Sequence, residues 1–202
     1  MKVGVVDYGG GNIRSVIQAL HALEVSPELV AVPEELAGLD SLIFPGQGAF
    51  GSCMEALQER DLVKPIQDWI AADRPFFGIC VGYQLLFEEG EENPGVSGLG
   101  VLKGRVVRFP DSDLKVPQMG WNSAQVVDTE SPFWDGLGEN PYFYFVHSYH
   151  PVPEDDSVVA TRTSYGLTYA SSVQRGNLLA TQFHPEKSQK AGMKLLSNFL
   201  GL

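Results

Sequence analysis

Two short segments of the chain carry residue types that together perform nucleophilic acyl transfer. The first spans residues 78–82 and reads Gly-Ile-Cys-Val-Gly, and the second spans residues 184–186 and reads His-Pro-Glu. A cysteine supplies the nucleophile, a histidine carries protons, and a carboxylate fixes the orientation of the histidine. The expected catalytic group is therefore Cys80, His184 and Glu186.

Cys80 is expected at a sharp turn between a strand and a helix. The apolar run 75–79 is long enough for one buried strand, and residues 81–89 favour a helix that the following glycine ends. Glycines two residues before and after the cysteine match the Gly-x-Ser-x-Gly elbow, with sulfur in place of oxygen. The helix N-terminus favours the thiolate, and the N–H of Val81 is free to donate to an oxyanion. Gln84 lies on the same helix face as the cysteine.

His184 and Glu186 are expected to face one site together. Residues 177–183 are typical of a buried strand, and Pro185 ends it because proline cannot donate to a sheet ladder. In extended backbone, residues two apart point the same way, so Glu186 can fix the imidazole tautomer. Each segment alone is more often a tight turn or a loop. Both, however, follow predicted strands at their C-terminal ends, where open α/β sheets place their sites.

Composition favours a globular enzyme of one domain, residues 1–202. Hydrophobic residues make up 44% and charged residues 19% of the 202-residue chain. The balance of 14 Lys and Arg against 25 Asp and Glu gives a net charge of −11, which argues against nucleic acid or an anionic membrane as partner. Two cysteines are too few for a disulfide scaffold, and a reactive thiol needs a reducing compartment. With no membrane span and no signal peptide in the sequence, a cytoplasmic location is expected.

The order of elements predicts an α/β fold of the flavodoxin-like, three-layer kind, with a mainly parallel, mixed central sheet and helices on both faces. In the first half, strands are expected over 3–7, 28–32, 41–44 and 75–79, with a helix over 12–23 capped by Asn12 and a helical region over 54–72 broken at Pro65. In the second half, short strands are expected over 101–102, 105–109, 123–127, 142–146, 157–162, 167–173 and 178–183, before a final helix over 189–200.

Two glycine loops follow predicted strands. Gly9–Gly11 matches neither common phosphate-loop pattern, so a tight turn is the favoured interpretation. The loop Pro45–Gly48 could direct amide groups toward a neighbouring site and supply a second oxyanion donor beside Val81; an ordinary turn is the alternative.

The two histidines at His147 and His150 have the spacing of metal ligands, but two ligands are too few for a zinc site. They are expected to border the cleft, and neither a metal nor a cofactor is expected. Cys53 is expected to be a small, partly buried filler.

The chain resembles the class I, triad-type glutamine amidotransferases from end to end, most closely the glutaminase subunits of imidazole glycerol phosphate synthases. The resemblance rests on segments 7–12, 45–50, 78–86, 117–122, 144–149 and 182–188. Two positions depart from the family pattern: Gln47 replaces a small aliphatic residue, and Tyr83 replaces a methionine.

The resemblance implies the same roles for Cys80, His184 and Glu186. It also implies a set of oxyanion-binding and substrate-binding residues, namely Val81, Gly46, Gln47, Gly48, Gln84, His147, Ser148 and Tyr149. Three further residues are implied to lie toward a partner, a cyclase subunit that forms a heterodimer with this chain: Asn12, Trp121 and Lys187.

Three functions are compatible with the sequence. The first is glutamine hydrolysis through a cysteinyl thioester, with ammonia passed to a separate cyclase subunit in histidine biosynthesis; no acceptor domain follows the last helix, so the acceptor is expected on another polypeptide. The second is the glutaminase subunit of another complex, such as pyridoxal phosphate synthase, against which residues 117–122 weigh. The third is a flavodoxin-like reactive-cysteine protein, either a redox sensor or a small hydrolase.

Overall fold

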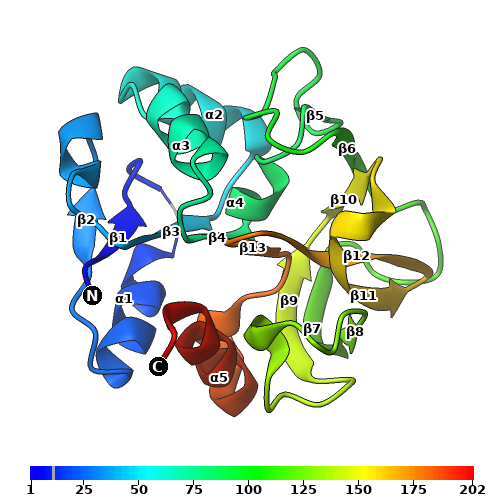
Figure 1. Ribbon diagram of the computed structural model, residues 1–202. Coiled ribbons are helices and arrows are strands. Elements are labelled where there is room, and N and C mark those ends of the chain that lie inside the picture. The colour runs from blue at the N-terminus through cyan, green and yellow to red at the C-terminus, as the bar shows by residue number, and fades with distance from the viewer. Residues whose placement is uncertain (11) are drawn as a thin grey trace.

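A computed structural model, which describes residues 1–10 and 12–202, contains a mixed sheet of eight strands (Figure 1). The strand order is β2-β1-β3-β4-β13-β12-β11-β8. The bounds of these strands are, in chain order, β1 (Val3–Val6), β2 (Glu28–Val30), β3 (Ser41–Gly46), β4 (Phe76–Cys80), β8 (Gln125–Val126), β11 (Val159–Tyr165), β12 (Leu167–Arg175) and β13 (Leu178–Thr181). Neighbours from β2 to β13 pair parallel, whereas β12, β11 and β8 pair antiparallel.

Helices cover both faces of this sheet. One face carries α1 (Ile13–Ala22) and α5 (Gln189–Leu200), and the other carries α2 (Phe50–Glu59) and α3 (Val63–Ala71) (Figure 1). A short helix, α4 (Val81–Gln84), follows β4 directly. The three layers confirm the predicted fold class. None of these helices is long and apolar enough to cross a membrane, as far as the described residues go.

The centre of the sheet is buried on both faces. Every residue of β1, β3, β4 and β13 is buried. Parallel strands between two helical layers lose contact with water on both sides, so they need continuous apolar sequence rather than alternation. This is why residues 76–80 and 178–181 were recognisable as strands from their composition.

Two smaller sheets lie beside the antiparallel end. One has the order β10-β6-β5 and is built from β5 (Glu89–Gly90), β6 (Gly104–Arg108) and β10 (Tyr149–Pro153). The other pairs β7 (Gln118–Ser123) with β9 (Tyr142–His147) in antiparallel register. Short 3₁₀ helices span Pro33–Leu36, Pro132–Trp134, Asp156–Val158 and Pro185–Lys187.

The helix predicted over residues 81–89 is wrong in length. It ends at Gln84, and residues 89–90 pair as β5 instead. The carbonyls of Leu85 and Leu86 accept from the N–H groups of Leu99 and Val101 at 2.7 and 2.9 Å. A neighbouring loop thus supplies the hydrogen bonds that another helical turn would have made, which local sequence does not reveal.

The break in the helical region 54–72 is also placed differently from the prediction. The chain interrupts the helices between Arg60 and Leu62, where Asp61 has a φ of 55°. Pro65 lies instead in the first turn of α3, where a missing N–H costs nothing because no intrahelical acceptor exists there.

Prediction was weakest in the second half of the chain. Residues 101–102 form no strand, β10 was not predicted, and β7 begins at Gln118, ahead of the strand expected over residues 123–127. In the first glycine loop, Gly9 has a φ of 85° and its N–H donates to the Asp7 carboxylate at 2.9 Å, which fits a tight turn; Gly11 lies outside the described residues. Cys53, expected to be partly buried, is buried almost completely on α2.

Candidate active site

Cys80 occupies a strained turn where β4 meets α4. Its φ of 56° and ψ of −107° lie in a region that residues with a Cβ rarely adopt. Strain of this kind persists only where the surroundings impose it, and it presents the side chain of the turn residue to the C-terminal edge of the sheet. The predicted elbow is therefore present in the backbone geometry.

Glycines make this turn possible by letting backbones touch. A Cβ on Gly82 would lie 2.1 Å from the carbonyl oxygen of Phe44, and a Cβ on Gly78 would lie 2.8 Å from the carbonyl oxygen of Gly82. Gly46 has the same role, since its Cβ would lie 2.3 Å from the Gly82 nitrogen. Gly46 was expected to bind substrate, but it packs beneath α4 and does not line the pocket.

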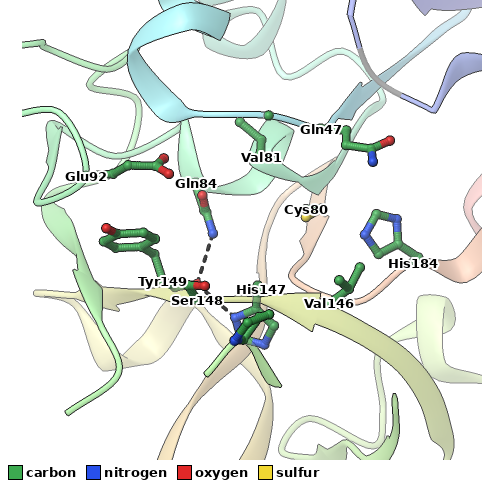
Figure 2. A pocket seen from close by; sticks show the side chains of 12 residues that line it. Gln47, Cys80, Val81, Gln84, Glu92, Val146, His147, Ser148, Tyr149 and His184 are labelled. Carbon is green, nitrogen blue, oxygen red and sulfur yellow. Dashed lines mark hydrogen bonds between the residues drawn. The ribbon is translucent and has the colours of Figure 1, made fainter. Parts of the chain in front are cut away.

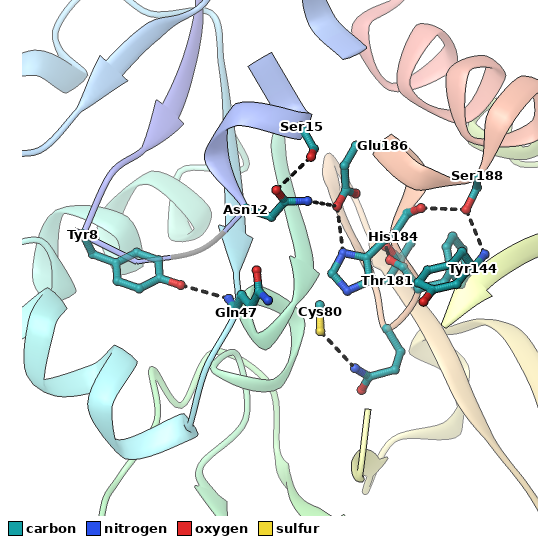
Figure 3. A network of polar contacts seen from close by, with 12 residues as sticks. Tyr8, Asn12, Ser15, Gln47, Cys80, Tyr144, Thr181, His184, Glu186 and Ser188 are labelled. Carbon is teal, nitrogen blue, oxygen red and sulfur yellow. Dashed lines mark hydrogen bonds and ion pairs between the residues drawn. The ribbon is translucent and has the colours of Figure 1, made fainter. Parts of the chain in front are cut away.

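His184 and Glu186 form a buried pair. The imidazole Nδ1 donates to the Glu186 Oε1 at 2.8 Å, and the two side chains are only 3% and 1% exposed. His184 Nε2 is buried, and no other described residue offers it a hydrogen-bond partner. Figure 3 shows the ring between the carboxylate and Cys80. The free nitrogen therefore faces the thiol, as transfer of a proton between them requires.

The charge state of His184 follows from these neighbours. Burial is the largest influence and lowers the pKa of His184, but the nearby Cys80 and the hydrogen bond to Glu186 outweigh it and raise the pKa to about 10. The imidazolium form of His184 is thus favoured, so the ring carries a proton that it can give to a leaving group.

Asn12 was expected at a partner interface, but its side chain meets the triad carboxylate. Its Nδ2 donates to the Glu186 Oε1 at 3.5 Å, and its Oδ1 accepts from the Ser15 hydroxyl at 2.8 Å (Figure 3). Asn12 stands at the N-terminus of α1 but makes no capping hydrogen bond through its side chain. The amide is therefore used to hold the carboxylate rather than to cap the helix.

A cavity of about 260 Å³ opens beside Cys80 and His184 (Figure 2). Its lining includes most of the expected oxyanion and substrate residues: Gln47, Gly48, Val81, Gln84, His147, Ser148 and Tyr149. Three further lining residues were not predicted from sequence: Glu92, Pro117 and Val146. The structure thus gathers residues from both halves of the chain around one small pocket.

A chain of buried amides leads from the cysteine to the pocket wall. Gln182 Nε2 lies 3.7 Å from the Cys80 Sγ, and its Oε1 accepts from Gln84 Nε2 at 3.1 Å. Gln84 Nε2 also donates to the Tyr149 carbonyl at 3.0 Å (Figure 2). With its nitrogen occupied twice, Gln84 has its Oε1 left as the acceptor for a ligand.

Gln182 and Glu92 were not predicted from the sequence, and the reasons differ. Gln182 precedes His184 by two residues, so alternation in the chain that leads to His184 could have identified it, whereas Glu186 lies in the 3₁₀ helix that follows. Glu92 lies in an acidic run without periodic pattern, and only tertiary folding brings it to the pocket.

His147 is held neutral in the pocket wall. Burial, the largest influence, lowers its pKa to about 3. Its Nδ1 donates to the Tyr149 carbonyl at 2.8 Å, and its Nε2 lies 3.1 Å from the Tyr169 hydroxyl oxygen. His150 is buried against Phe109 and does not line the pocket, and no metal-binding cluster of three ligands occurs among the described residues.

The two candidate oxyanion donors differ in their state. Val81 is the first residue of α4, so its N–H has no acceptor within the helix. The N–H of Gln47 instead donates to the Tyr8 hydroxyl at 3.1 Å. Gln47 therefore lines the pocket, while its backbone N–H is hydrogen-bonded to Tyr8 rather than free to bind an oxyanion.

Trp121 and Lys187 lie outside the pocket lining. Trp121 is 47% exposed on β7, with its ring edge-on to Tyr144 at 6.3 Å. Lys187 is half-buried in the 3₁₀ helix that contains Glu186. Both side chains therefore reach the protein surface outside the pocket.

Comparisons with known proteins show what the whole chain is similar to. The family model of class-I glutamine amidotransferases matches residues 4–201. The imidazole glycerol phosphate synthase subunit HisH of Salinibacter ruber is 48% identical, over 98% of this chain and 93% of that protein, and the subunit of the same name from Methanocaldococcus jannaschii is 44% identical over 99% of both. A crystal structure of a glutamine amidotransferase superposes with a TM-score of 0.74 at 27% identity, covering 98% of this chain and 97% of that one.

Proposed function

This chain belongs to the class-I glutamine amidotransferase family, and we propose from that premise that it is the glutaminase subunit of an imidazole glycerol phosphate synthase. The proposal is carried by one observation: a buried His184–Glu186 pair, 2.8 Å apart, lies beside a cysteine on a strained turn. The chain hydrolyses glutamine to glutamate and ammonia, and ammonia passes to a separate cyclase subunit in histidine biosynthesis.

The reaction proceeds in two steps. The Cys80 thiolate attacks the side-chain carbonyl carbon of glutamine, and the imidazolium of His184 gives its proton to the departing nitrogen, which leaves as ammonia. Water then adds to the γ-glutamyl thioester while His184 takes a proton from it, and the thiolate leaves with glutamate as product. Glu186 keeps Nδ1 protonated and Nε2 directed at the reacting atoms throughout.

The pocket lining fits the substrate's charged groups. Glu92 supplies a carboxylate that can pair with the α-ammonium of glutamine, and Gln84 offers its Oε1 as a further acceptor. The Glu92 side chain is itself fixed, because its Oε2 accepts from the Phe50 N–H at 2.8 Å. A pocket of this size, with these acceptors, suits one free amino acid.

Both tetrahedral intermediates need oxyanion donors. The Val81 N–H is one, and the Gln47 N–H is the other once it turns toward Cys80. Removing a single donor of this kind costs roughly 10²- to 10³-fold in rate. The chain alone is therefore expected to hydrolyse glutamine slowly.

An apolar surface next to the pocket suits the cyclase subunit. Met119, Trp121 and Tyr142 are 65%, 47% and 60% exposed. The β7–β9 register pairs Met119 with Val146 and Trp121 with Tyr144, so these side chains share one face of the ribbon. Val146 also lines the pocket, and the backbone carbonyl of Tyr144 accepts from the backbone N–H of His184 at 2.9 Å. A subunit docked on this face would reach the site directly.

Steady-state glutaminase assays test the proposal. Glutamine hydrolysis is measured for the chain alone, for the chain with the cyclase subunit, and for that complex with the cyclase's nucleotide substrate. We expect rates that rise in this order, by roughly 10²- to 10³-fold between the first and the last. Equal rates in all three mixtures, or failure of the two subunits to co-purify, would refute it.

A further inference from the structure

The Pro45–Gly48 loop is held by two side chains outside the catalytic group. The Gln47 N–H donates to the Tyr8 hydroxyl at 3.1 Å. The Cys53 Sγ lies 3.6 Å from the same hydroxyl and 3.8 Å from the Gln47 carbonyl oxygen. If each proton is used once, the Tyr8 O–H donates to sulfur and the Cys53 S–H donates to the Gln47 carbonyl. The three residues then form a closed ring of hydrogen bonds.

This ring fixes both peptide units that flank Gln47. Its N–H belongs to the peptide that begins at Gly46, and its carbonyl belongs to the peptide that ends at Gly48. The two side chains are themselves rigid, because Tyr8 and Cys53 are buried and the Tyr8 ring packs edge-on against Phe44 at 5.8 Å. Burial raises the pKa of both the phenol and the thiol, so both keep the protons that the ring requires at neutral pH.

The direction of the held amide matters for the reaction. Figure 3 draws Tyr8 and Cys80 on opposite sides of Gln47, so an N–H that donates to Tyr8 is turned away from the cysteine. Gly46 is packed against Gly82 and cannot follow, whereas Gly48, with a φ of 118°, tolerates backbone angles that other residues do not. Turning the N–H toward Cys80 therefore requires rotation of the peptide between Gly46 and Gln47, which breaks the bond to Tyr8.

We propose that Tyr8 is a positioning residue of the glutaminase reaction, which, together with Cys53, withholds the second oxyanion donor in the free chain. The inference rests on the proposed function and adds the two residues that restrain the Gln47 N–H. Activation by the cyclase subunit then has to break these hydrogen bonds. Their strength therefore sets how slowly the chain hydrolyses glutamine without its partner.

The test replaces Tyr8 by phenylalanine, which keeps the aromatic ring packed on Phe44 and removes the hydroxyl, and with it both the acceptor for the Gln47 N–H and the donor to Cys53. A buried N–H without a partner costs about 1–3 kcal/mol, so the held orientation loses its advantage. We expect kcat of the chain alone to rise at least about fivefold, the value for 1 kcal/mol, while KM for glutamine changes less than twofold. Stimulation by the cyclase subunit with its nucleotide substrate should fall by the same factor.

Tyr165→Phe is the matched control, because its hydroxyl donates to the Lys115 carbonyl at 2.7 Å, away from the pocket. This variant should keep the wild-type kcat and the wild-type stimulation. An unchanged or lower kcat in folded Tyr8→Phe, with wild-type stimulation, overturns the inference and leaves the proposed function intact. A wild-type complex that does not hydrolyse glutamine overturns both.

Cys53→Ala covers the case in which Tyr8→Phe does not fold. It removes the donor to the Gln47 carbonyl but leaves the Tyr8 acceptor in place. We expect a smaller rise in partner-free kcat, about two- to fivefold, because hydrogen bonds to sulfur are weak. A folded Cys53→Ala chain whose kcat and stimulation match the wild type contradicts the ring.

Discussion

The two halves of the chain build their shares of the site by different means. In the first half, close backbone contacts force Cys80 into its strained turn, and Gly78 and Gly82 are the residues that permit the approach. In the second half, buried polar groups orient one another: Glu186 holds His184, and the Tyr149 carbonyl holds His147 and Gln84. The halves meet where β4 pairs with β13 in parallel register.

This difference separates two kinds of sensitivity. A site built by backbone contact depends on side-chain volume and is indifferent to pH, since no proton takes part. A site built by buried polar groups depends on which protons are present and on every partner being in place. Volume changes should therefore damage the first half, and changes of charge or hydrogen bonding should damage the second.

The largest effect is expected at the nucleophile, where the halves meet. Cys80→Ala removes the group that forms the thioester, so glutaminase activity should fall by roughly 10⁴-fold or more. A glutamine-like electrophile followed by peptide mapping should label Cys80 in the wild type. Predominant labelling of Cys53 would show that the nucleophile has been assigned to the wrong thiol.

Glu186→Gln tests the polar half with little change of volume. The amide can offer its N–H₂ to the imidazole and stabilise the wrong tautomer, so kcat should fall roughly 10²- to 10³-fold, less than for Cys80→Ala. Steady-state assays of the complex measure this, and the folding stability of the variant is its control. A loss equal to that of Cys80→Ala would mean that the carboxylate takes part in chemistry rather than in orientation.

Gly82→Ala tests the first half of the chain, which depends on close backbone contacts. There, one added methyl group should be enough to destabilise the fold. Its Cβ would lie 2.1 Å from the Phe44 carbonyl oxygen, within packed backbone, so we expect a loss of about 3 kcal/mol in the free energy of unfolding. Gly95→Ala is the control, because nothing lies within 4 Å of its Cβ and only its φ of 87° is strained. Urea unfolding compares the two, and equal losses would remove the steric argument.

The smallest effect, taken per pH unit, is a pH dependence of stability that belongs to the polar half. His147 has a pKa lowered to about 3 by burial, against about 6.5 in the unfolded chain, so the unfolded state binds the extra proton first on acidification. The free energy of unfolding should therefore fall between pH 6.5 and 3, by up to about 1.4 kcal/mol per pH unit. The raised pKa of His184 acts oppositely: its contribution is present below pH 6.5 and is lost as pH rises toward about 10.

His147→Gln isolates that contribution, because it keeps a polar side chain but no titrating ring. Urea unfolding at several pH values should show a shallower acid slope for the variant than for the wild type. Parallel slopes would assign the acid sensitivity to other groups, such as His150, whose pKa burial also lowers.

By itself the sequence determined the elements whose signals are local. The apolar runs of the parallel strands and the glycines around Cys80 are legible because burial on both faces and close backbone approach constrain residue type directly. The pairing of His184 with Glu186 was predicted from extended backbone, but Glu186 lies in a 3₁₀ helix, so the reason given for that pairing was wrong. The final helix was predicted at residues 189–200, as the structure has it.

Tertiary structure alone decided which distant residues contact one another at the site. The helix after Cys80 is cut short because residues of a distant loop take its carbonyls, Glu92 reaches the pocket from a run without periodicity, and Asn12 meets Glu186 across the fold. The direction of the Gln47 N–H depends likewise on Tyr8 and Cys53, neither of which adjoins it in the chain. Such hydrogen bonds join residues far apart in sequence, so no local pattern of residue types records them.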